Sequence, residues 1–162
     1  MGVRWPPAGL HAESHMLRTI LVALAGSALA EPALPLAADI ARRSGGSVHL
    51  VRAHVPIAGG GATAQGAIFS QEMLAADDAR RRRAQAYVDS TATRLVAEWG
   101  LRVTGEPTRC LLDHVKETDP DGIAIAIATQ GRGVSRILVG SIGDKLIPSA
   151  GRPVLVVRPP KG

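Results

Sequence analysis

The segment IAIATQGRGVSRILVGSIGDKLIPSAGRPVLVV, residues Ile125–Val157, contains the pattern that decides the fold prediction. It begins inside an apolar run, Ile123–Ala128, which is typical of a parallel strand buried on both faces of a sheet. A second apolar run, Val154–Val157, ends the segment and predicts another strand. The glycine-rich residues between the two runs predict a tight loop followed by a short helix around Ile142–Ile147.

The predicted loop offers backbone amides to an anion. Gly131–Gly133 combines flexible glycine backbone with the cation of Arg132. Ser141, which follows Gly140, is a suitable N-cap for the short helix, with Asp144 three residues later as in a capping box. Amides at a glycine turn and at a helix start both suit phosphate. The alternative is that these glycines only form turns and caps, which explains less well why both groups of amides follow a buried strand.

The rest of the chain alternates between strand patterns and helix patterns. Short runs of β-branched and aliphatic residues alternate with longer segments whose apolar residues recur at helical spacing. Such alternation predicts a parallel sheet with helices on both faces. The further predicted strands are Leu17–Leu24, Ser47–Val55 and Leu101–Gly105, and the further predicted helices are Leu29–Ser44, Ser70–Glu98 and Pro107–Lys116.

Length and composition bound the class of protein. A chain of 162 residues suits one domain with a substantial core. Hydrophobic residues are 46% of the chain but aromatic residues only 2%, so the core must be aliphatic and rich in alanine. The formal net charge of +5 permits attraction to phosphate. The scarcity of aromatic side chains for base stacking argues against specific nucleic-acid binding, and no apolar run is long enough to predict a membrane span.

The N-terminal residues Met1–His15 show no usable periodicity. We expect a disordered extension there, or upstream residues with Met16 as the natural start, and we expect one α/β domain over residues 16–160. The N-terminus lacks the apolar region of a secretory signal. The single cysteine, Cys110, cannot form an internal disulfide, which suits a reducing compartment. These features predict a cytoplasmic protein.

Titratable residues outside the glycine loop show no catalytic or metal-binding spacing. His49, His54 and His114 have no ligand spacing with Cys110 or with carboxylates, so each is interpreted as a surface or strand histidine. Cys110 falls on a predicted helix with no base assigned beside it, which favours a packed thiol over a nucleophile. Four consecutive arginines, Arg80–Arg83, point around a helix and predict a solvated face. We therefore predict no catalytic residue and no metal site.

The glycine loop resembles the signature of the universal stress protein family. That signature is a glycine, two residues, a glycine, nine residues and then Gly-Ser or Gly-Thr. Gly131, Gly140 and Ser141 match it. The resemblance covers nearly all of Met16–Pro159, including GEPTRCLLDHV as the junction of the third strand with its helix and Arg152–Arg158 as the last strand.

The resemblance implies a fold, a ligand and a dimer. With right-handed crossovers it implies an open, doubly wound, Rossmann-like sheet of five parallel strands in the order 3-2-1-4-5, with helices on both faces. Ligands of such sheets bind at the switch point, here between strands one and four. In family members that bind ATP the loop holds the ribose and phosphates, so ATP with Mg is the implied ligand. The implied contact positions are Ala25, Val55, Ala128, Gly131, Arg132, Gly133, Gly140, Ser141 and Ile142, and the implied homodimer pairs through Val154, Leu155, Val156 and Val157.

The chain departs from the family's ATP-binding pattern in three places. Ala25 stands where ATP binders usually have an aspartate that contacts the nucleotide. Ala128 replaces the first glycine, and alanine tolerates positive φ poorly. The spacer Arg132–Val139 has eight residues instead of nine. Two functions therefore stay open, a stress-response regulatory module that binds an adenine nucleotide and a protein-interaction module with a vestigial pocket. An enzyme is not expected, beyond slow intrinsic ATP hydrolysis, because no carboxylate is placed to activate water at the loop.

Overall fold

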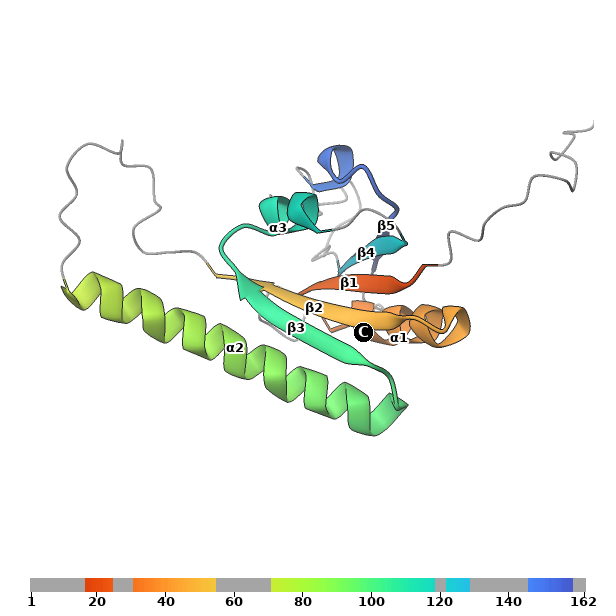
Figure 1. Cartoon of the computed structure of the whole chain (residues 1–162), viewed down its shortest axis with the longest axis horizontal. Coiled ribbons are helices and arrows are strands. Elements are labelled where there is room, and N and C mark those ends of the chain that lie inside the picture. The colour runs from red at the N-terminus through yellow and green to blue at the C-terminus, as the bar shows by residue number, and fades with distance from the viewer. Residues whose placement is uncertain (1–16, 25–30, 55–70, 119–121, 129–145, 159–162) are drawn as a thin grey trace, which may run out of the picture.

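The computed structural model describes residues 17–24, 31–54, 71–118, 122–128 and 146–158 (Figure 1). The strands form a parallel sheet in the order β3-β2-β1-β4-β5, which confirms the predicted doubly wound topology. A further helical turn spans residues 146–149. In chain order the elements are β1 (Thr19–Leu24), α1 (Ala33–Ser44), β2 (Ser47–Ala53), α2 (Gln71–Trp99), β3 (Val103–Thr108), α3 (Leu111–Glu117), β4 (Ile123–Ala128) and β5 (Val154–Val157).

Helices cover both faces of the sheet. On one face α1 packs on β1, β2 and β4, and α2 packs on β2 and β3; α3 lies on the opposite face (Figure 1). Because successive strand residues point to opposite faces, neighbouring residues of one strand join different cores. The core beneath α1 and α2 includes Ile20, Val22, Leu50, Val88 and Leu95, and the core beneath α3 includes Leu21, Val51, Val115, Ile125 and Leu146. Both cores are aliphatic, as the composition predicted.

Two element boundaries depend on glycine and proline. Gly45 ends α1 in the left-handed conformation, with φ of 66°, and its N–H is directed at the carbonyl oxygens of Ala41 and Arg42. The prediction that Pro107 begins the third helix is wrong, because Pro107 lies within β3 and α3 begins at Leu111. Among the described strands β3 pairs only with β2 and lies at the edge of the sheet, so the missing N–H of Pro107 can face away from the ladder.

Candidate functional site

The switch point of the sheet lies between β1 and β4. These strands are parallel neighbours, in register from Thr19 beside Ile123 to Val22 beside Ala126. The connection that leaves β1 passes through α1 on one face, whereas the connection that enters β4 passes through α3 on the other face. Crossovers that diverge in this way leave a crevice beyond the carboxyl ends of the two strands, where open parallel sheets bind ligands.

Ala128 is the one predicted ligand-contact position that the structure describes. It is the last residue of β4, lies beside Val157 of β5 and packs half-buried against the core beneath α1. No non-glycine residue among the described ones has positive φ, so Ala128 adopts a conformation that suits alanine. The expected backbone penalty at this position is therefore absent. The other predicted contact positions lie outside the described residues and remain predictions: Ala25, Val55, Gly131, Arg132, Gly133, Gly140, Ser141 and Ile142.

A cavity of about 360 Å³ lies at the carboxyl ends of β2 and β3, beside the start of α3. His54, directly after β2, is buried, and neither of its ring nitrogens has a hydrogen-bond partner in the described part of the chain. Cys110 is exposed at the N-cap of α3, so the prediction of a packed thiol is wrong. The prediction placed Cys110 within the helix, whereas α3 begins at Leu111 and Cys110 precedes it. The cavity is lined in part by His54, Arg81, Thr108, Cys110, Asp113 and His114.

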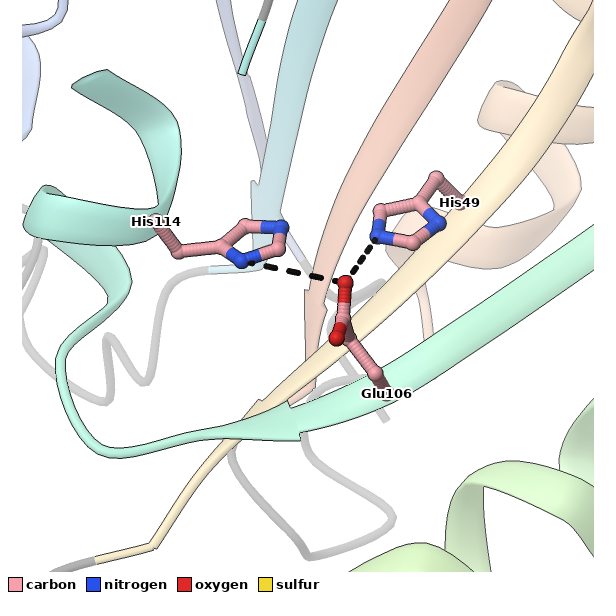
Figure 2. Close-up of side chains that lie close together, drawn as sticks. All are labelled: His49, Glu106 and His114. Atoms are coloured by element: carbon pink, nitrogen blue, oxygen red, sulfur yellow. Dashed lines mark ion pairs between the residues drawn. The ribbon is translucent and has the colours of Figure 1, made fainter. Parts of the chain in front are cut away.

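His49, Glu106 and His114 form a cluster that spacing in the sequence did not predict (Figure 2). The Oε1 atom of Glu106 lies 3.7 Å from Nε2 of His49 and 4.0 Å from Nδ1 of His114. The two imidazole rings are nearly parallel, with centroids 5.5 Å apart. His49 Nδ1 also hydrogen-bonds the hydroxyl of Thr104 at 2.8 Å. The cluster joins β2, β3 and α3 on the face that α3 covers.

The surroundings of His49 favour its neutral form. Burial lowers the pKa of His49, and the neighbouring His114 lowers this pKa further, while Glu106 raises it. The net pKa is below the ordinary value of 6.5. The folded protein therefore takes up a proton at His49 less readily than the unfolded chain does.

The comparison with family models decides the family. The model described as the universal stress protein family matches residues 16–158. The chain belongs to the universal stress protein family. The search of curated proteins finds no match for this universal stress protein. Within the described residues, it has no helix long and apolar enough to cross a membrane.

Solved structures of universal stress proteins share this fold. The universal stress protein UspA from Lactobacillus plantarum is 18% identical, with a TM-score of 0.70, and the match covers 88% of this chain and 98% of that one. A universal stress protein in complex with cAMP is 18% identical, with a TM-score of 0.53 and coverage of 88% and 98%. One from Archaeoglobus fulgidus in complex with dAMP is 21% identical, with a TM-score of 0.56 and coverage of 87% and 98%.

The depressed pKa of His49 predicts that this universal stress protein loses stability on acidification. A group with a lowered folded-state pKa contributes stability above its unfolded pKa, here 6.5, and this contribution is lost as the pH falls through the folded pKa. In His49→Gln, the free energy of unfolding should therefore depend less steeply on pH below 6.5. Urea unfolding at a series of pH values, with EDTA present, measures both slopes. Equal slopes for the two proteins would contradict the prediction.

Proposed function

We propose that this universal stress protein is a regulatory module that binds an adenine nucleotide, ATP with Mg, at the switch point between β1 and β4. The observation that carries the proposal is the placement of these two strands side by side and parallel. Ala25 directly follows β1, and the glycine loop that begins near Gly131 follows β4. Both segments therefore start at the carboxyl ends of neighbouring strands, where ligands of this fold class bind.

The residues of the loop supply the chemistry that phosphate requires. Gly131 and Gly133 allow a backbone approach without side chains, Arg132 supplies a cation, and Gly140 and Ser141 supply amides and a hydroxyl. Two universal stress proteins of the same fold were solved in complex with cAMP and with dAMP, so adenine nucleotides suit this fold. The proposed role is binding without catalytic turnover. Its place of action is the cytoplasm.

A protein-interaction module with a vestigial pocket is the second candidate. The absence of an aspartate at position 25 favours it, because the nucleotide then lacks an acceptor. The conformation of Ala128 removes only the argument from positive φ, and the added methyl group still favours this candidate. The two candidates differ in whether the purified, folded protein retains a nucleotide.

Release of bound nucleotide separates the two candidates. The untagged protein is purified, denatured, and the supernatant is analysed by chromatography. Adenine nucleotide in the wild type and none in Gly140→Val, with both proteins equally stable to heat, would support the nucleotide-binding module. If the wild type releases no nucleotide and a Mg-ATP titration produces no heat, the proposal fails and the interaction module takes its place.

The dimer is also part of the proposal, and β5 is its contact surface. β5 is an edge strand of the sheet, and Val156 in it is 39% exposed. An exposed apolar edge strand favours pairing with another chain. A second copy of this chain, paired through β5, would cover Val156.

Val156→Glu should dissociate this dimer. A carboxylate at the interface would be buried without a partner, which costs about 3 kcal/mol and weakens association about 100-fold. Sedimentation equilibrium of the wild type and the variant measures the change. Val96→Glu is the matched control, because Val96 is 46% exposed on α2, which packs on β2 and β3, whereas β5 lies at the other edge of the sheet. A monomeric wild type, or a variant that dimerises normally, would contradict the assignment of β5.

A further inference from the structure

We propose that His49, Glu106 and His114 bind a divalent transition-metal ion, with Zn²⁺ as the preferred ion. The cluster lies at the β2–β3 side of the sheet, beneath α3 (Figure 2). It is separate from the switch point, which lies between β1 and β4. The proposal is therefore independent of nucleotide binding.

The fold brings the three residues together from distant parts of the sequence. His49 of β2 lies beside Thr104 of β3 in the parallel register. Glu106, two residues after Thr104, points to the same face of the sheet. α3 packs on that face and supplies His114, whose ring points toward Glu106 (Figure 2). Sheet register and helix packing thus fix three potential ligands around one point.

The distances are close to those of a metal site. The ligand atoms of the three side chains all lie within 4.8 Å of one another, and Glu106 Oε1 lies 3.7 Å from His49 Nε2. Zinc ligands lie about 2.0–2.2 Å from the ion, so two ligands of a tetrahedral ion are about 3.4 Å apart. The two imidazole rings are nearly parallel, so binding requires them to rotate until both ring nitrogens face the ion. The side chain of Glu106 is 56% exposed and can follow this movement.

The set of donors selects the class of ion. Two imidazoles and one carboxylate suit zinc and similar transition metals, and three protein ligands leave a fourth position to water. Mg²⁺ and Ca²⁺ prefer sites built from oxygen. The carboxylate of Glu106 supplies a negative charge that favours a cation at this point.

Each of the two histidines has one ring nitrogen within 4.0 Å of Glu106 Oε1. Metal-binding histidines usually donate their second ring N–H to an oxygen, and the Thr104 hydroxyl, 2.8 Å from His49 Nδ1, can accept such a bond when the ring proton is on Nδ1. In that tautomer the lone pair is on Nε2, which lies 3.7 Å from Glu106 Oε1. Nε2 of His114 is buried without a hydrogen-bond partner in the part of the chain that the structure describes. Nδ1 of His114 lies 4.0 Å from Glu106 Oε1 and is the nitrogen that this residue offers to the ion.

A route to the ion is also present. His114 lines the cavity of about 360 Å³ at the ends of β2 and β3, and Glu106 is accessible to solvent. A bound ion would connect α3 to the β2–β3 edge. Because an ion that binds only the folded state stabilises it, Zn²⁺ should raise the melting temperature in a concentration-dependent way.

Titration of metal-free, untagged full-length protein with Zn²⁺ tests the proposal. Calorimetry should show saturable binding of one ion per chain, and Co²⁺ should give the absorption bands of a four- or five-coordinate site. Glu106→Gln, which keeps the shape of the side chain, and His114→Gln should each weaken binding at least about tenfold. Thr104→Val should weaken it about tenfold by releasing the ring of His49.

Two control variants exclude other zinc-binding residues near the cluster. Cys110→Ser and His54→Gln alter neighbouring potential ligands that line the same cavity, and both should bind Zn²⁺ like the wild type. Circular dichroism of each variant checks that the fold is intact. The proposal is overturned by an absence of saturable binding, by binding that Glu106→Gln leaves unchanged, or by binding that Cys110→Ser removes.

Discussion

Replacing Gly105 with valine is expected to destabilise the domain by about 3 kcal/mol. A Cβ atom at Gly105 would contact the Val88 side chain of α2 and would lie 2.8 Å from the carbonyl oxygen of Leu50. Valine gains at most about 1 kcal/mol from its preference for strands. The contact with the backbone outweighs this gain, because rotation of a side chain cannot relieve it. α2 would have to move away from β3, and urea unfolding measures the cost.

The substitution Thr104→Val is the matched control for Gly105→Val. Thr104 precedes Gly105 in β3, is exposed, and faces the other side of the sheet. This control loses one hydrogen bond, to His49, and should change the free energy of unfolding by about 1 kcal/mol at most. If Gly105→Val unfolds at the same urea concentration as the control, the close packing of α2 on β3 is incorrect.

Replacing Ala25 with aspartate is expected to strengthen ATP binding about 10- to 100-fold. The position directly follows β1 and matches the aspartate that contacts the nucleotide in the family's ATP binders. A hydrogen bond to a charged group contributes about 1.5–3 kcal/mol, and each 1.4 kcal/mol changes affinity about tenfold. Calorimetric titration with Mg-ATP measures the gain.

A control with the same change of charge distinguishes the contact from a general electrostatic effect. Ala75 is an exposed residue of α2, so Ala75→Asp changes the net charge equally without placing a carboxylate at the switch point. Its affinity for ATP should equal that of the wild type. Equal or weaker binding by Ala25→Asp would show that the nucleotide does not lie beside the end of β1.

The strands of the central sheet could be predicted because their signals are local. β4 has the predicted bounds, since six consecutive apolar residues between Gly122 and Thr129 allow few other interpretations. The third strand was predicted too early, because a proline signals a helix start and an edge strand equally well. Only the pairing of Pro107 with Arg52 of β2 resolves that ambiguity. Register of this kind depends on contacts between distant segments.

The histidine cluster could not be predicted from spacing. His49, Glu106 and His114 lie in three different elements, and the β2–β3 register and the packing of α3 bring them together. Strand alternation shows which face each residue takes, but not which residues oppose each other. The switch point differs from the histidine cluster. A sequence signature predicts the ligand-contact positions there, and the structure describes Ala128 alone among them.

Calorimetric titration of nucleotide-free protein with Mg-ATP tests the central claim most directly. The account predicts saturable binding of one nucleotide per chain to the wild type and no binding to Gly140→Val at the same thermal stability. A folded wild-type protein that takes up no ATP would contradict the account. The switch point at the ends of β1 and β4 would then bind no nucleotide, and the function would lie in protein contacts.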